Sequence, residues 1–218
     1  MENDLMRLRA QIDQIDQQIL DLLLRRLQMA GEIAKEKSDG ASVFRPDREA
    51  QLLAHLCATA DPQIHPVINA VWRAIISASI ARQRPNFTIL MTAESEQTAR
   101  SFAAGQLSVK QTGSPLELCQ QLAAGAADIG IFEADELNSI HSQLGLDLPV
   151  KIIAGLPLLR KSESVPSAFI VGCELPDKNV QACLVIYDKT HQTINLAAAA
   201  EENLPSERSV LGICSLIG

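Results

Sequence analysis

The sequence lacks the features that would place it in a membrane, in a secretory pathway or among the metal enzymes. No apolar run approaches the roughly 20 residues that a membrane span needs, and the acidic, charged N-terminus does not have the form of a secretory signal. Five cysteines occur without CxxC spacing, and four histidines occur without an HExxH pair. We therefore expect a cytoplasmic protein with neither a metal site nor a disulfide framework.

The sequence also has no Gly-rich phosphate loop, no internal repeat and no low-complexity linker. Its net charge of -7 is uneven, because residues 1–85 contain 11 basic and 11 acidic residues whereas residues 86–218 contain 8 and 15. The acidic excess of the second part disfavours nucleic acid and anionic membranes as partners. In the neutral first part, any basic chemistry must be local.

The first 38 residues are predicted to form one long helix. Apolar side chains recur there at alternating steps of three and four, which is typical of a helix-packing seam. Such a helix spans roughly 50 Å, too long to fold back on a domain of this size, so we expect much of it to pack against a second copy of the chain. The residues of this apolar seam are Leu5, Leu8, Ile12, Ile15, Ile19, Leu22, Met29 and Ile33.

Two shorter helices are predicted to follow. Pro46 suits the first turn of a helix that runs to about residue 60, and a third helix begins near Pro66 and stops before Pro85. Residues 1–85 are therefore predicted to be an all-α domain of three helices. The inward face of the third helix is predicted to carry Val67, Val71, Ile75 and Ile76.

From residue 86 onward the pattern changes to short apolar and β-branched runs separated by helix-like stretches, which predicts an α/β domain over residues 86–218. The pattern does not place residues 192–209. The predicted strands are residues 87–91, 127–132, 150–159, 168–173 and 183–187, and the predicted helices are residues 98–104 and 115–124.

Several polar residues interrupt the apolar faces of the helical part. Arg26 continues the seam four residues after Leu22, and Lys37 follows 11 residues later, a rotation of about 20° on a helix. A seam arginine can serve as an internal ion pair or a register device. A second cation on the same face favours an anion site, because burying cations together is costly without a negative ligand.

Two further polar pairs are ambiguous when taken alone. Ser79 and Gln83 lie four residues apart on the third helix, among isoleucines, and suit either a helix–helix hydrogen bond or a site. Arg48 and Glu49 in the first turn of the second helix are equally compatible with solvated surface charge.

Together these positions resemble a family, the all-helical chorismate mutases, over about 80 residues. Arg45 departs from the pattern, since some members have an acidic residue there. The residues that carry the resemblance are 8–16 (LRAQIDQID), 23–26 (LLRR), 33–37 (IAKEK) and 45–50 (RPDREA), followed by Ser79 and Gln83.

The resemblance implies a cofactor-free enzyme that rearranges chorismate to prephenate in phenylalanine and tyrosine biosynthesis, as an intertwined helical homodimer with two sites. It implies that Arg26, with Arg9 and Arg48, binds the substrate carboxylates, and that Lys37 and Gln83 face the ether oxygen. We count Lys37, Gln83 and Arg26 as the catalytic residues, and Arg9, Arg48, Glu49 and Ser79 as the substrate-binding residues.

The position of Arg9 predicts that it is shared between subunits. Arg9 precedes Arg26 by 17 residues, roughly 26 Å along a helix and rotated by about 100°, and a small dicarboxylate cannot span that gap. If both arginines bind substrate, they belong to two different sites, so Arg9 would serve the site of the partner.

Two other function classes remain open. Isochorismate pyruvate lyases share the helical scaffold and similar cations, and a non-catalytic, dimeric regulatory or binding protein would need only the seam. The second part resembles prephenate dehydratases at residues 114–119 (SPLELC), 125–131 (GAADIGI) and 152–158 (IIAGLPL). Their catalytic Thr-Arg-Phe run is missing, since residues 166–170 read PSAFI. We interpret this part as a truncated, non-catalytic relative.

Overall fold

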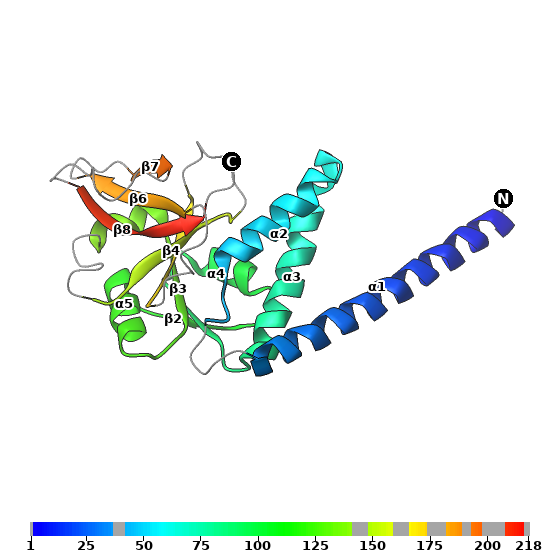
Figure 1. The fold of residues 1–218 in the computed structure, drawn as a ribbon, viewed down its shortest axis with the longest axis horizontal. Coiled ribbons are helices and arrows are strands. Elements are labelled where there is room, and N and C mark those ends of the chain that lie inside the picture. The colour runs from blue at the N-terminus through cyan, green and yellow to red at the C-terminus, as the bar shows by residue number, and fades with distance from the viewer. Residues whose placement is uncertain are drawn as a thin grey trace.

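The computed structural model describes residues 2–36, 42–140, 148–158, 166–173, 182–188, 193–197 and 208–215. In these ranges a helical N-terminal region is followed by an α/β region built on one mixed sheet, as predicted (Figure 1).

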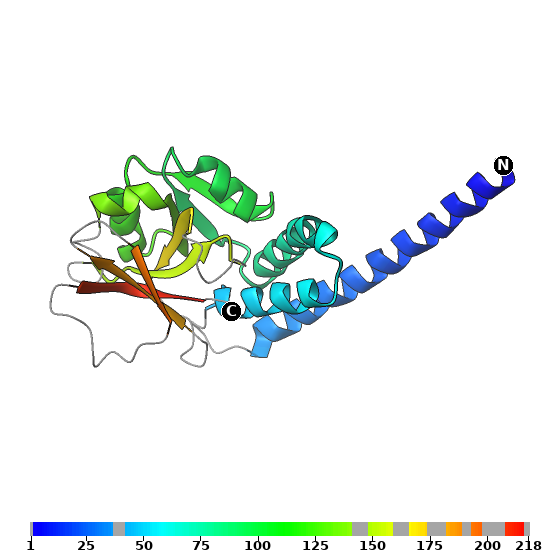
Figure 2. The same cartoon turned by 90° about the horizontal axis from the view of Figure 1, so that it is seen from above.

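Helix α1 (Glu2–Glu36) is a single rod of 35 residues, as the periodicity predicted. Its C-terminal part packs against α3, whereas its N-terminal half projects away from the rest of the molecule (Figures 1 and 2). The apolar seam is consequently uncovered in the single chain: Ile12 is 57% exposed and Leu22 is 66% exposed. A helix of this length and apolarity needs a covering surface that one chain does not supply.

Helices α2 (Pro46–Ala58) and α3 (His65–Gln83) follow, joined through the short helix η1 (Pro62–Ile64). Pro46 opens α2 because its fixed φ suits a first turn, and the Asp61 carboxylate caps η1 by accepting from the Gln63 backbone N–H at 2.8 Å. These bounds agree with the predicted second and third helices to within about two residues.

The predicted inward face of α3 was partly wrong. Val67 and Val71 are 60% and 44% exposed in the single chain, and Ile75 is half-buried. The face that packs inward carries Ile68, Ile76 and Ile80, spaced by eight and four residues, with Trp72 between the first two. The buried face is therefore rotated by one position, about 100°, from the predicted one. Of the predicted residues, only Ile76 belongs to it.

One helical segment among the described residues, Pro62–Gln83, is long and apolar enough by composition to cross a membrane. The expectation that no stretch approaches that length is therefore not confirmed. In this structure the segment packs against α1, α2 and α4 and forms a buried ion pair with α2.

The sheet has the strand order β2-β1-β3-β5-β4-β8-β6-β7 in the described ranges. Strands β1, β2 and β3 pair in parallel, as do β4 and β8, and the remaining pairs are antiparallel. The strands are β1 (Thr88–Met91), β2 (Ser108–Gln111), β3 (Ile129–Glu133), β4 (Lys151–Leu156), β5 (Ala168–Gly172), β6 (Ala182–Asp188), β7 (Thr193–Ala197) and β8 (Arg208–Ser215). The helices of this part are α4 (Glu96–Ala103), α5 (Pro115–Ala123) and η2 (Ala134–Ser139).

All five predicted strands and both predicted helices are present, with ends shifted by at most three residues. Strand β2 was missed because its short sequence, SVKQ, is mostly exposed and carries no apolar run. Strands β7 and β8 were also missed, and they begin inside the stretch 192–209 that the pattern left unplaced. Residues 192, 198–207 and 216–218 lie outside the described residues.

Alternation along β1 shows how the sheet is covered on two faces. Ile89 and Met91 join a core shared with α2, α3 and α4, whereas Leu90 joins a second core beneath α5. The first core runs without a break from Phe44 and Ile80 of the helical part to the strands. Helix α3 and strand β1 lie on either side of residues 85 and 86, where a domain boundary was predicted, and the two parts share one hydrophobic core.

Candidate functional site

A cavity of about 530 Å³ lies between the C-terminal half of α1, the start of α2 and the end of α3. Five of the seven residues singled out from the sequence line it, although they come from three separate segments. These five are Arg26, Arg48, Glu49, Ser79 and Gln83. Apolar side chains such as Met29, Ile33, Leu52 and Ile80 complete its wall.

Arg26 and Ser79 form the hydrogen-bonded base of this cavity. The Arg26 Nη1 donates to Ser79 Oγ at 2.5 Å, and Ser79 Oγ donates in turn to the Ile75 carbonyl at 2.8 Å. Ser79 is buried, so its hydroxyl has a fixed orientation. The guanidinium of Arg26 is thereby held on α3, 53 residues away in the chain. Within the described residues no hydrogen bond of its Nε or Nη2 is found, so these donors suit a ligand.

Gln83 lies one turn beyond Ser79 and presents an unpaired polar group to the cavity. Its Nε2 donates to the Ser79 carbonyl at 3.2 Å, while its Oε1 is buried and has no hydrogen-bond partner in the described part of the chain. A buried amide group without a partner is uncommon in folded proteins and suits a site that a ligand completes. The Nε2 group carries two hydrogens, so one N–H remains for a ligand besides the one that bonds the Ser79 carbonyl.

Glu49 is buried and is held by a residue that the sequence analysis missed. Arg73 of α3 donates from Nη1 to Glu49 Oε2 at 2.7 Å, and both side chains are largely buried. Arg73 also donates from Nε to Ser77 Oγ at 3.2 Å and lies 4.2 Å from the centre of the Phe102 ring. Its sequence position could have indicated a buried ion pair, since Arg73 is the one charged residue between His65 and Arg82.

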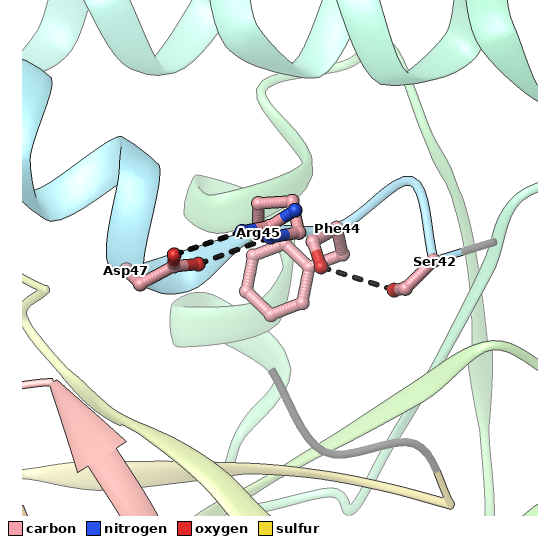
Figure 3. Close-up of polar contacts among 4 residues, drawn as sticks. All are labelled: Ser42, Phe44, Arg45 and Asp47. Carbon is pink, nitrogen blue, oxygen red and sulfur yellow. Dashed lines mark hydrogen bonds and ion pairs between the residues drawn. The ribbon is translucent and has the colours of Figure 1, made fainter. Parts of the chain in front are cut away.

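The start of α2 carries a second ion pair, between Arg45 and Asp47 (Figure 3), and Arg45 lines the cavity. Arg45 donates from Nη2 to Asp47 Oδ2 at 3.1 Å and from Nε to Asp47 Oδ1 at 3.3 Å, a two-point contact with a buried carboxylate. Just before it, Ser42 Oγ donates to the Phe44 carbonyl at 3.0 Å, and the Phe44 ring is buried in the shared core. Arg45, which departs from the resemblance, is therefore built into the cavity wall, and the adjacent Arg48 is exposed to solvent.

The charges of the cavity perturb one another. Burial lowers the pKa of the Arg26 guanidinium and neighbouring Arg48 lowers it further, while Glu49 acts in the opposite direction. Burial raises the pKa of the Glu49 carboxyl above its ordinary value, with a smaller contribution from Asp47, although Arg73 and Arg26 act to lower it. Such a set, with three arginines and one carboxyl in a largely apolar cavity, favours an anionic ligand that also donates a hydrogen bond.

Of the remaining two candidates, only Arg9 lies within the described residues, and it is not among those that line this cavity. Arg9 is exposed on the projecting half of α1, 17 residues before Arg26, which corresponds to roughly 26 Å along the helix axis. Lys37 lies outside the described residues.

Comparison with known proteins gives three findings. Residues 8–84 match the family model described as chorismate mutase type II. A bifunctional chorismate mutase/prephenate dehydratase from Stutzerimonas stutzeri is 27% identical over 139 residues, covering 59% of this chain and 38% of the relative. One from Pseudomonas aeruginosa is 25% identical over 141 residues, covering 60% and 38%.

A fourth similarity is shorter and closer. A T-protein from Enterobacter agglomerans is 44% identical over 55 residues, which is 25% of this chain and 15% of the relative. The chain thus spans well under half the length of the bifunctional relatives. A match covering 59% of the chain exceeds what the first 85 residues can supply, so it continues into the α/β part. No solved structure matches the chain significantly.

Proposed function

We propose that this chain, whose residues 8–84 are a chorismate mutase type II domain, rearranges chorismate to prephenate in the cavity between α1, α2 and α3. The observation that carries the proposal is that one cavity gathers Arg26, Arg48, Glu49, Ser79 and Gln83 from three helices. A non-catalytic helical dimeriser would have no need of this arrangement.

The reaction requires only that the substrate be positioned and that its developing negative charge be stabilised, because it is an intramolecular rearrangement of a dicarboxylate. Arg26, anchored on Ser79, and Arg48 at the rim suit the two carboxylates, since a guanidinium binds a carboxylate through two parallel hydrogen bonds. Holding the substrate in its compact form supplies orientation, the main source of catalysis in such reactions.

The polar groups at the inner end of the cavity suit the developing charge and the ring hydroxyl. Gln83 Nε2 has a second N–H besides the one that bonds the Ser79 carbonyl, and with Lys37 it would donate to the breaking ether oxygen. A preorganised donor of this kind is worth about 10² to 10³ in rate. Glu49, held by Arg73, would accept from the ring hydroxyl in its ionised form.

The active form is proposed to be a homodimer in which Arg9 serves the site of the partner. The uncovered seam of α1 supports this, because Leu5, Leu8, Ile15 and Ile19 are each at least 50% exposed in the single chain. An antiparallel pairing of two α1 helices would cover the seam and bring the N-terminal end of one to the middle of the other.

The α/β part is proposed to be a non-catalytic relative of the prephenate dehydratase region, with a regulatory or partner-binding role. Its likeness continues along the sequence beyond residue 85, but residues 166–170 lack the Thr-Arg-Phe run. A cytoplasmic location belongs to the same proposal.

The test is to offer the full chain chorismate and isochorismate in parallel. Formation of prephenate from chorismate, lowered about 10²-fold or more by Gln83→Ala, is the expected result. The matched control is Gln51→Ala, which removes an exposed glutamine of α2 and should leave the rate unchanged. Release of pyruvate from isochorismate as the faster reaction would instead assign the lyase activity, and no turnover of either compound would assign a binding protein.

A further inference from the structure

A second cavity, of about 410 Å³, lies where the helical part meets the α/β part. Residues from α2, α3, α4, the end of β4 and Ser167, which precedes β5, line it, so both parts of the chain build it. Ile76 lines this cavity and the mutase cavity, which makes α3 a common wall. Most of the lining is apolar, including Leu53, Phe102, Leu156 and Leu158, and the volume lies in the range of small-molecule sites.

Two side-chain atoms of residues that line this cavity are buried and have no hydrogen-bond partner in the part of the chain that the structure describes. They are Nη2 of Arg73 and Oδ1 of Asn69. The two residues are four apart on α3 and therefore share one face of the helix. One atom is a donor and the other an acceptor, and groups of this kind are nearly always paired in folded proteins unless a ligand or water completes them.

The charge balance around Arg73 decides which polar head group of a ligand fits this cavity. The guanidinium of Arg73 already pairs with the Glu49 carboxylate at 2.7 Å through Nη1, so the pair is balanced before a ligand arrives. A ligand with one uncompensated negative charge would lie beside Glu49 and be repelled by it. A head group with no net charge, carrying an acceptor next to a donor, satisfies both orphan atoms without that repulsion.

We propose that this second cavity binds a small apolar molecule whose uncharged or zwitterionic head group accepts from Arg73 Nη2 and donates to Asn69 Oδ1. Its apolar body lies against Leu53, Leu156 and Leu158. Occupancy acts on the mutase cavity because the same guanidinium holds Glu49, and this last step rests on the proposed mutase function.

The binding test uses calorimetric titration of the full chain with four probes that share a phenyl body. The probe 3-phenylpropanamide carries a neutral acceptor and donor, L-phenylalanine carries them as a zwitterion, 3-phenylpropanoate carries acceptors alone, and ethylbenzene carries no head group. At least one of the first two should bind about tenfold or more tightly than either of the others, as expected when a buried polar partner is otherwise left unpaired. Equal affinities for all four, or no binding of the first two, would overturn the proposal.

Variants locate the bound probe. Asn69→Leu has a similar volume and removes the acceptor, so it should weaken binding by about tenfold or more, whereas Asn69→Asp retains an acceptor oxygen and should bind. Gln83→Leu, in the mutase cavity, should leave the affinity unchanged. Binding that is lost in Gln83→Leu and retained in Asn69→Leu would place the probe in the mutase cavity and refute the second site. Thermal unfolding of each variant checks that it is folded.

The coupling step is measured separately, as the KM for chorismate with and without saturating probe. A change of KM that disappears in Asn69→Leu supports transmission through Arg73 and Glu49. If the probe binds but the KM for chorismate does not change, the proposed coupling is refuted while the proposed binding site stands. Because binding is measured by heat, a failure of the mutase proposal and a failure of this one give different results.

Discussion

The sharing of Arg9 between two subunits can be tested by mixing two defective chains. Arg9 lies roughly 26 Å along α1 from Arg26, whereas a sphere with the volume of the mutase cavity, 530 Å³, is only about 10 Å across. One substrate therefore cannot contact both arginines of the same chain. Gln83, by contrast, lines the cavity together with Arg26 of its own chain.

Two chains, Arg9→Ala and Gln83→Ala, are therefore co-expressed with different affinity tags. In a mixed dimer with sharing in trans, one cavity has its own Gln83 and the partner's intact Arg9, while the other cavity lacks both. Random assembly makes about half of the dimers mixed, each with one intact site of two, so about a quarter of wild-type activity should return. Mixed dimers purified through both tags should show about half of it.

The matched control mixes Arg26→Ala with Gln83→Ala. Both residues line the cavity of one chain, so every cavity in every dimer is defective and no activity should return. The assay is prephenate formation by parents, mixtures and doubly purified dimers. Mixed Arg9→Ala and Gln83→Ala dimers that are present but no more active than their parents would refute the sharing, and a chain that is monomeric in solution would refute the dimer.

Three further predictions concern single residues of the mutase cavity. Gln83→Glu should be active at acid pH, where the carboxyl is protonated and can donate, and should lose activity as pH rises; a flat pH–rate profile would contradict the donor role. Ser79→Ala removes the acceptor that orients Arg26 and should lower kcat/KM by about tenfold or more, with a smaller effect on the melting temperature, and the reverse pattern would make Ser79 merely structural. Burial raises the pKa of the Glu49 carboxyl in the folded protein above its value in the unfolded chain. Between these two pKa values the folded protein keeps a proton that the unfolded chain has released. The free energy of unfolding therefore falls as pH rises through this range. Urea unfolding from about pH 4 to 8 should show this fall in the wild type and a smaller one in Glu49→Gln, and identical profiles would exclude the shift.

Periodicity was sufficient where a residue's role depends on its own helix. The steps of three and four along α1 predicted its length and the position of Arg26 on its packing face, and the spacing of Ser79 and Gln83 predicted that they share a face. These inferences need only 3.6 residues per turn. The same argument failed for Val67 and Val71, because apolar residues lie all around α3 and a helix without a clear polar face leaves its rotation undetermined.

Contacts between different helices and strands could not be predicted from the sequence. The Arg73–Glu49 pair joins residues 24 apart on two helices, and nothing local to either residue indicates the other. The edge-to-face contact of Phe44 with Phe102, at 5.6 Å between ring centres, joins the loop before α2 to α4 and closes the shared core. Periodicity reports that a residue is buried or exposed, and the partner is decided only when the helices pack against the sheet.

The exposed seam of α1 and the buried faces of α3 together explain why five candidates meet in one chain and Arg9 does not join them. Helix α3 packs on α1, α2 and α4, so every polar residue on its inner faces, from Arg73 to Gln83, has its environment fixed within the chain. Helix α1 contacts α3 only near its C-terminal end, and a polar residue such as Arg9, on the half that nothing covers, acquires an environment only when another surface covers the seam. Periodicity gives the face of each of these residues, but the partner of the seam decides whether Arg9 belongs to a site.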